Sequence, residues 1–119
     1  MLAEDNNINQ AIAKKLFQKL GYSIDLAKDG IEAITAVHEN KYDMIFMDMQ
    51  MPNMDGVTAT KAIIKEQPEN HPYIVAMTTN VLPQDRQKCF DAGMKDFVGK
   101  PVNIDHIIKA IEDYGDSES

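Results

Sequence analysis

The sequence is poor in cysteine, in basic residues and in long apolar runs, and each shortage excludes a class of protein. Its single cysteine, Cys89, rules out a disulfide framework, and no Cys/His spacing suggests a zinc site. No apolar run approaches the 18 or so residues of a membrane helix, and the acids at positions 4 and 5 come too early for a secretory signal. With 12 Lys and Arg against 19 Asp and Glu, the net charge of −7 should repel nucleic acid and anionic lipid. We therefore expect a cytoplasmic domain that contacts neither of them directly.

The remaining composition fits one globular domain. Of the 119 residues, 44% are hydrophobic, which excludes a disordered chain. A chain of this length buries roughly two-thirds of its unfolded surface around a single core. The last five residues are small and polar, typical of a frayed end or a linker. We predict a domain over residues 1–114 and a polar tail or linker start over residues 115–119.

Short apolar runs alternate five times with amphipathic stretches. The predicted strands cover residues 1–3, 23–27, 42–48, 73–78 and 97–98, and the one at 23–27 shows apolar–polar alternation rather than a continuous apolar run. Stretches with helical spacing follow them at residues 8–20, 30–37, 57–64, 83–93 and 104–111. In the second of these stretches we expect Ile31, Ile34 and Val37 to be buried. Five strand–helix pairs with short connections predict an α/β fold, a parallel sheet with helices on both faces, because each crossover must be right-handed.

Polar side chains follow the predicted strands, where ligands of such sheets gather. They are Glu4, Asp5, Asp48, Thr78 and Lys100. Three carboxylates at neighbouring strand ends repel one another, and a hard divalent cation such as Mg²⁺ would relieve that repulsion. The lysine and the threonine make sense if another anion joins the site, and a phosphoryl group is the natural candidate. Any one acid alone fits a solvated loop residue, but that interpretation strains to explain all five side chains.

Five motifs, at residues 3–9, 47–56, 76–78, 91–94 and 97–101, together extend over essentially the whole chain. In order and spacing they resemble the receiver domain of two-component response regulators. The resemblance implies a flavodoxin-like fold with five parallel strands in the order 2-1-3-4-5. The motif Glu-Asp-Asn-x-x-Asn at residues 4–9 is similar to receivers attached to hybrid histidine kinases. A stand-alone regulator is the open alternative.

The resemblance also implies a metal-dependent phosphoacceptor. Asp48 would accept a phosphoryl group from a phosphohistidine. Asp5 and Asp48 would hold Mg²⁺ together with the backbone carbonyl of Gln50, and Glu4 would act mostly through water. Such a domain is a signalling switch rather than an enzyme, although slow autodephosphorylation is compatible with it.

Further residues would bind the phosphoryl group and transmit its arrival. Thr78 and Lys100 would each contact a phosphoryl oxygen. Phe97 resembles the family's switch aromatic, which moves inward when Thr78 is drawn to the phosphate, so that the face of the fourth helix, fifth strand and fifth helix changes. The bond from Lys100 to Pro101 is expected to be cis, which aims the lysine at the site.

Two features depart from the family's pattern. The first strand, residues 1–3, is shorter than the usual five or six residues and therefore looks truncated. Thr79 follows Thr78 where the family mostly keeps a small residue, and its branched side chain would narrow access for the phosphoryl group.

Other interpretations differ from this one at particular residues. Ile8 would either belong to the core or lie exposed where a histidine kinase or histidine phosphotransfer partner docks. An aspartyl-phosphate phosphatase would carry a second aspartate two residues after the nucleophile, but Gln50 occupies that position. A dinucleotide-binding domain would need a Gly-x-Gly-x-x-Gly turn, which the first turn lacks. None of the three histidines has a phosphodonor motif beside it, so the donor must come from elsewhere.

Overall fold

The protein forms one parallel sheet with helices on both sides. A computed structural model describes residues 1–51, 53–79, 83–100 and 102–118. The strands in chain order are β1 (Leu2–Ala3), β2 (Leu26–Ala27), β3 (Met44–Asp48), β4 (Tyr73–Thr78) and β5 (Asp96–Gly99). They are arranged β2-β1-β3-β4-β5, and all neighbouring pairs are parallel. The predicted fold class, strand order and short first strand are confirmed.

The second strand is shorter than the sequence suggested. The alternation over residues 23–27 predicted a five-residue strand, but only Leu26 and Ala27 pair, with Leu2 and Ala3 of β1. Since β2 lies at the edge of the sheet, its length is limited by its single partner, which offers only two residues. Local alternation could not reveal that limit.

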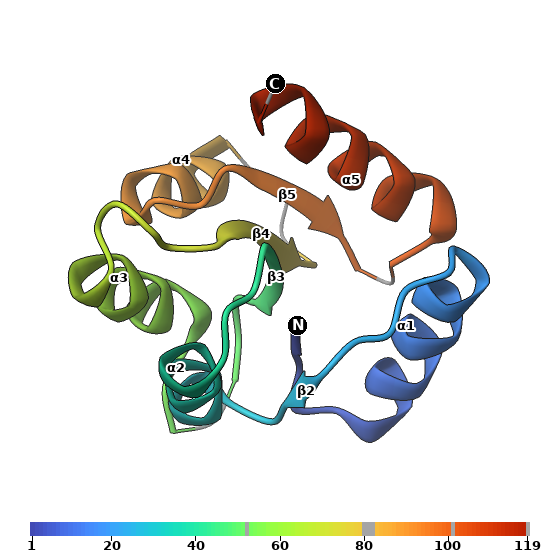
Figure 1. Ribbon diagram of the computed structural model, residues 1–119, viewed down its shortest axis with the longest axis horizontal. Helices are drawn as coiled ribbons and strands as arrows, with labels where there is room; N and C mark the ends of the chain where they lie inside the picture. Colours follow the sequence, from blue (N-terminus) through green and yellow to red (C-terminus); the bar gives the residue numbers. More distant parts are fainter. Residues whose placement is uncertain (52, 80–82, 101, 119) are drawn as a thin grey trace.

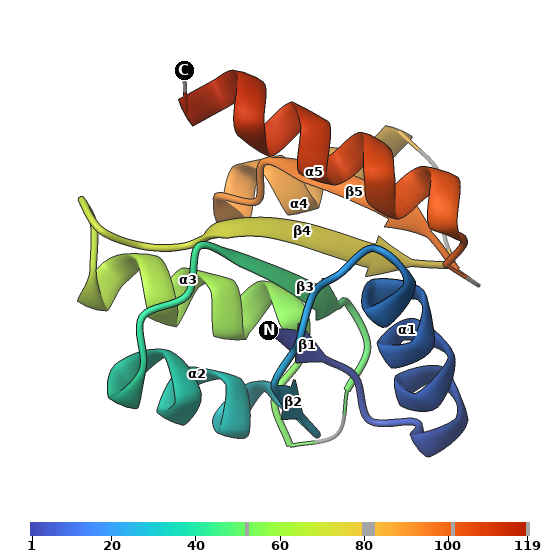
Figure 2. The same cartoon turned by 45° about the vertical axis from the view of Figure 1, so that its right-hand side comes forward.

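Two helices cover one face of the sheet and three cover the other, as Figures 1 and 2 show. The helices are α1 (Asn7–Lys19), α2 (Gly30–Glu39), α3 (Gly56–Glu66), α4 (Pro83–Ala92) and α5 (Ile104–Glu118). Helices α1 and α5 pack on one side, and α2, α3 and α4 on the other. The α5 helix continues into residues 115–118, so the backbone there is helical, and the domain boundary at residue 114 stays a prediction.

Each face of the sheet has its own apolar cluster. Ala13 and Phe17 of α1 pack with Ile107 of α5, and Ala33 and Val37 of α2 belong to the opposite cluster. The prediction that Ile31 is buried is wrong, because its side chain is 50% exposed. Residues two positions apart in a helix point in nearly opposite directions, so with Ala33 facing the sheet Ile31 faces solvent.

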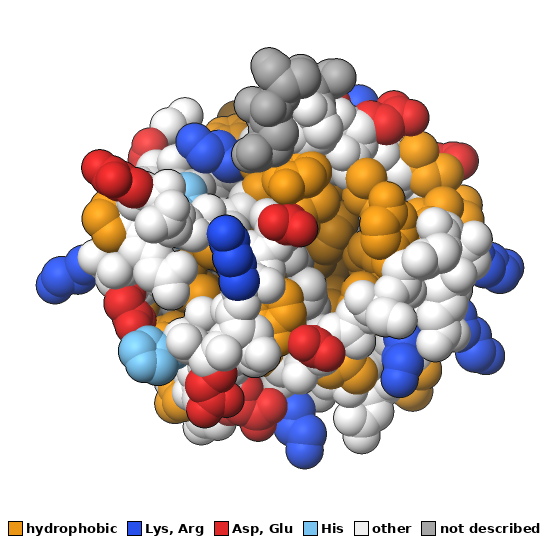
Figure 3. All heavy atoms as spheres, viewed as in Figure 1, with side chains coloured by type: hydrophobic (Ala, Val, Ile, Leu, Met, Phe, Trp, Pro, Cys, Tyr) orange, Lys and Arg blue, Asp and Glu red, His pale blue; other side chains and the backbone are white. Residues whose placement is uncertain are grey.

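The surface carries charges of both signs. On the face shown in Figure 3, apolar side chains line a hollow, and acidic and basic side chains are scattered around it. Among the helices of the described residues, none combines the length and apolar content needed to cross a lipid bilayer.

Candidate functional site

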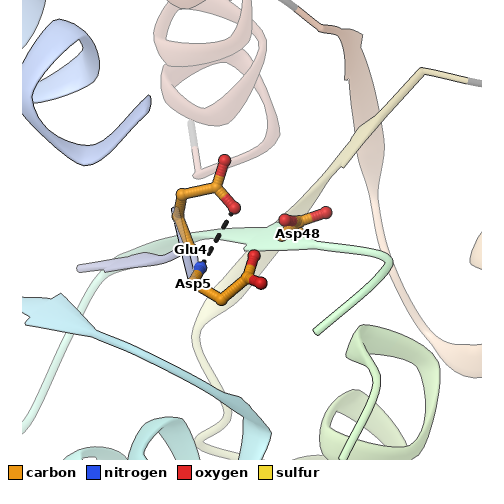
Figure 4. Close-up of side chains that lie close together, drawn as sticks. All are labelled: Glu4, Asp5 and Asp48. Atoms are coloured by element: carbon orange, nitrogen blue, oxygen red, sulfur yellow. Dashed lines mark hydrogen bonds between the residues drawn. The ribbon is translucent and has the colours of Figure 1, made fainter. Parts of the chain in front are cut away.

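Three carboxylates meet where β1 and β3 end. Glu4 and Asp5 follow β1, and Asp48 is the last residue of the neighbouring β3. One carboxylate oxygen from each lies within 4.8 Å of the others, as Figure 4 illustrates. Glu4 and Asp48 are 1% and 2% exposed, whereas Asp5 is open to solvent. The arrangement of parallel strands therefore brings together the acids that the sequence singled out.

Lys100 approaches the acids from the end of β5. Its Nζ lies 2.8 Å from Oδ2 of Asp48 and 3.0 Å from Oε1 of Glu4. Burial alone would lower the pKa of Lys100, but the carboxylates of Asp48 and Glu4 outweigh it and raise that pKa. The pKa of Glu4 is also raised, first by burial and then by the neighbouring Asp48. One ammonium thus faces two buried carboxylates, which leaves the cluster with excess negative charge.

The donor set suits a hard divalent cation. Oε1 of Glu4 lies near the lysine but lacks hydrogen-bond geometry, and it has no hydrogen-bond partner among the described residues. Its ion pair with Lys100 is shared with Asp48, so one ammonium compensates two buried carboxylates and a further cation would be favourable there. Oxygen ligands with room for water are those that Mg²⁺ prefers. The residues present therefore fit Mg²⁺.

Neighbouring amides fix the orientation of the acids. The backbone N–H of Gln50 donates to Oδ1 of Asp48 (3.1 Å), and that of Asp5 donates to Oε2 of Glu4 (3.1 Å). The side chain of Gln10 donates to the backbone carbonyl of Glu4. Sequence analysis missed Gln10, because a polar residue within an amphipathic helix gives no local sign that it faces inward.

Thr78 and Thr79 lie at the same end of the sheet. Thr78 ends β4 and is 8% exposed, whereas Thr79 is exposed. A cavity of about 230 Å³ is lined by both threonines together with Asp5, Asp48 and Lys100. Gln50 lines it too. Except for Glu4, which sits beside this cavity, the predicted metal and phosphoryl residues therefore surround one space.

Phe97 lies away from that cavity. Its half-buried ring sits in β5 and contacts two residues of α4, Arg86 and Phe90. Pro101 falls outside the described residues, so the predicted cis bond stays a prediction. Ile8 is 71% exposed, which rules out the core role that the sequence left open.

The start of α3 depends on a glycine. Gly56 begins α3, and its N–H donates to the backbone carbonyl of Met49 (3.2 Å). A Cβ at Gly56 would collide with the backbone carbonyl oxygen of Asp48. The absence of a side chain there lets α3 start directly behind Asp48.

A family model described as the response regulator receiver domain matches residues 1–112. The chain belongs to this family. Receiver domains are the phosphoacceptors of two-component phosphorelays and not their catalytic domains. The resemblance inferred from the motifs is confirmed.

Relatives of the receiver domain include parts of much longer kinases. The chain is 38% identical over 120 residues to hybrid signal transduction histidine kinase K of Dictyostelium discoideum, and the alignment includes 94% of the chain and 10% of the kinase. It is 39% identical over 127 residues to histidine protein kinase 1 of Candida albicans, with 98% of the chain and 5% of the kinase. The chain therefore spans a tenth or less of these two relatives.

Solved structures agree with the fold. The receiver domain of Ssk1 from Saccharomyces cerevisiae, in a co-crystal with the histidine phosphotransfer protein Ypd1, matches with a TM-score of 0.91 and 34% identity over 98% of this chain and 88% of that one. The receiver domain of a sensor histidine kinase from Pseudomonas aeruginosa matches with a TM-score of 0.86 and 34% identity over 95% and 93% of the two chains. That structure has a magnesium ion coordinated in its active-site cleft.

Proposed function

We propose that Asp48 is the phosphoacceptor of this receiver domain. The observation that carries the proposal is the position of its carboxylate, nearly buried at the end of β3, with Lys100 at 2.8 Å and the Gln50 N–H at 3.1 Å. In the transfer, a carboxylate oxygen of Asp48 forms a bond to phosphorus, and the phosphorus–nitrogen bond of a phosphohistidine breaks. The electron pair stays on the imidazole nitrogen, and the product is an acyl phosphate.

We propose that Asp5, Asp48 and the backbone carbonyl of Gln50 hold Mg²⁺, and that Glu4 contributes mostly through water. Bound there, the ion would neutralise charge on the acids and on the incoming phosphoryl group. The cluster of three acids supports this assignment. The burial of Glu4 supports an indirect role, because its carboxylate is already engaged with Lys100.

Two side chains would bind the loaded phosphoryl group. Lys100 already reaches Asp48, so a small movement of its ammonium would let it contact a phosphoryl oxygen attached there. The hydroxyl of Thr78 would donate to another oxygen from the next strand end. Thr79, exposed at the mouth of the cavity, would restrict entry, and Phe97 would transmit loading to the face formed by α4, β5 and α5.

The phosphodonor would be a histidine kinase or a histidine phosphotransfer protein that docks on α1 near Ile8. Support comes from the exposure of Ile8 and Ile12, 71% and 44%, on the helix that follows the acids. The likeness to the receiver in the Ypd1 co-crystal is consistent with such a partner. We further propose that the chain is part of a hybrid histidine kinase, as its relatives are, in which case the full-length protein would be a kinase. Slow autodephosphorylation and a cytoplasmic location also stay predictions, testable by phosphoryl lifetime and by cell fractionation.

The decisive experiment is mass spectrometry after incubation with acetyl phosphate. The wild type should gain one phosphoryl group when Mg²⁺ is present and none with a chelator, because an unshielded approach of two anions is repulsive. Asp48→Asn should abolish labelling, whereas Asp43→Asn, an exposed acid before the same strand, should not. Stoichiometric labelling of Asp48→Asn would refute the assignment, and multiple turnover of donor would indicate a phosphatase.

A further inference from the structure

Three side chains form a compact cluster on the α4 side of β5. The guanidinium carbon of Arg86 lies 4.5 Å from the centre of the Phe97 ring. The ring of Phe90 meets the same ring edge-on, with centroids 6.4 Å apart and planes at 77°. Arg86 and Phe90 are four residues apart in α4, so they lie on one face of that helix. Phe97 is therefore held from one side by two residues of a single helix.

Arg86 has no competing partner within the described part of the chain. Although the domain is rich in carboxylates, Arg86 forms no ion pair among the described residues. Its guanidinium lies over the Phe97 ring instead. Such a contact is attractive because the ring face carries partial negative charge. It is also directional, since the guanidinium must lie over the ring. Movement of the ring away from α4 would break it.

The same helix is linked to the phosphoacceptor loop. The thiol of Cys89 donates to Sδ of Met49 at 3.6 Å, and Met49 directly follows Asp48. Cys89 lies one residue before Phe90 on the same helix and is buried, so its side chain points into the core beside this cluster. One helix thus contacts both the proposed switch ring and the residue beside the proposed phosphoacceptor.

We propose that Arg86 is a positioning residue that holds the Phe97 ring against α4 and thereby opposes the conformational change that follows phosphoryl binding at Asp48. The inference rests on the proposed function of Asp48 and Phe97. A contact made in only one of two conformations shifts their equilibrium by at most its own free energy. For an exposed cation–π pair that limit corresponds to about a two- to fivefold change in affinity.

The test measures binding of beryllofluoride, a phosphoryl analogue, in the presence of Mg²⁺. Arg86→Ala should bind it about two- to fivefold more tightly than the wild type, because the ring is released. Arg86→Lys, which keeps the charge but not the planar group, should give an intermediate value. The affinity for Mg²⁺ alone should not change. Lys88→Ala, an exposed cation on the same helix, serves as the matched control and should behave as the wild type.

A second background makes the test specific to the ring. In Phe97→Leu, which removes the aromatic face, Arg86→Ala should have no further effect on beryllofluoride affinity. Weaker binding by Arg86→Ala would place the contact in the loaded conformation, and unchanged binding would show that Arg86 does not hold the ring; either result overturns the proposal. An equal effect of Arg86→Ala in both backgrounds would overturn it too. If the wild type itself bound no beryllofluoride with Mg²⁺, the proposed function would fail rather than this inference.

Discussion

Removal of the Lys100 ammonium should destabilise the domain through its two buried partners. The side chains of Glu4 and Asp48 are 2% and 3% exposed, and that of Lys100 is 17% exposed. Without the lysine, two carboxylates whose oxygens lie within 4.8 Å would face each other with little water between them. At an effective dielectric constant of about 20, their repulsion amounts to about 3 kcal/mol. Because Glu4 escapes part of this cost by taking up a proton, we expect Lys100→Ala to lose about 2–3 kcal/mol of unfolding free energy.

The pH dependence of that loss gives an independent check. Burial raises the pKa of Glu4 above its ordinary 4.5, so the folded state binds a proton more readily than the unfolded chain. Its contribution to stability is present below the unfolded pKa and is lost as the pH rises through the folded pKa. Without Lys100 the folded pKa rises further, so the deficit of Lys100→Ala should be larger at neutral pH than below about pH 4.5.

Denaturant unfolding measures both effects. Lys95→Ala, an exposed lysine just before β5, is the matched control and should change the unfolding free energy by less than about 0.5 kcal/mol. Adding Glu4→Gln to Lys100→Ala should recover much of the loss, since one of the two charges is then gone. Mg²⁺ should stabilise Lys100→Ala more than the wild type, because it replaces the missing cation. Equal unfolding free energies for Lys100→Ala and Lys95→Ala would refute this account of the site.

Three further changes test other parts of the structure. Gly56→Ala should cost about 1–3 kcal/mol in unfolding free energy because its Cβ would meet the backbone carbonyl of Asp48. Gly115→Ala, at a helical position with open space, should not destabilise the domain; equal values would contradict the close approach. Asp96→Asn should raise the melting temperature near pH 7 but not below about pH 4. The reason is that burial, followed by the nearby Asp113, raises the pKa of Asp96, so its charged form is disfavoured in the fold. A gain in melting temperature that does not depend on pH would exclude this cause. Thr79→Ala should speed phosphoryl loading from acetyl phosphate by widening the mouth of the cavity, and unchanged loading rates would show that the methyl group is no barrier.

The sequence predicted those site residues that terminate strands. Asp48 and Thr78 end apolar runs, and the topology of a parallel sheet brings such ends together, so their proximity followed from the local pattern and the predicted fold. Contacts that depend on side-chain direction across elements could not be predicted in this way. The side chain of Gln10 donates to the backbone carbonyl of Glu4, and the guanidinium of Arg86 lies over the Phe97 ring. Neither the type nor the spacing of these residues indicates these contacts.

The other wrong predictions concern the length of a strand at the sheet edge and the buried face of a helix. The alternation of residues 23–27 looked like a full strand, but the pairing length depended on a partner far along the chain. Ile31 is apolar and its spacing to Ile34 and Val37 fits a helix face, yet the face of α2 that joins the core cluster carries Ala33 and Val37. Ile31 lies two residues before Ala33 and therefore points to solvent.

The buried thiol of Cys89, which contacts Met49, allows the opening of α4 to be followed by chemical modification. Cys89 is the only thiol in the sequence and is 1% exposed, so a thiol reagent can reach it only when α4 lifts from the sheet. Burial, followed by the nearby Asp85, raises the pKa of this thiol and keeps it protonated, which slows modification further. The rate of alkylation in the native protein therefore measures how often α4 opens, without any engineered label. Since Met49 adjoins Asp48, we expect any change at Asp48 that displaces Met49 to alter this rate as well.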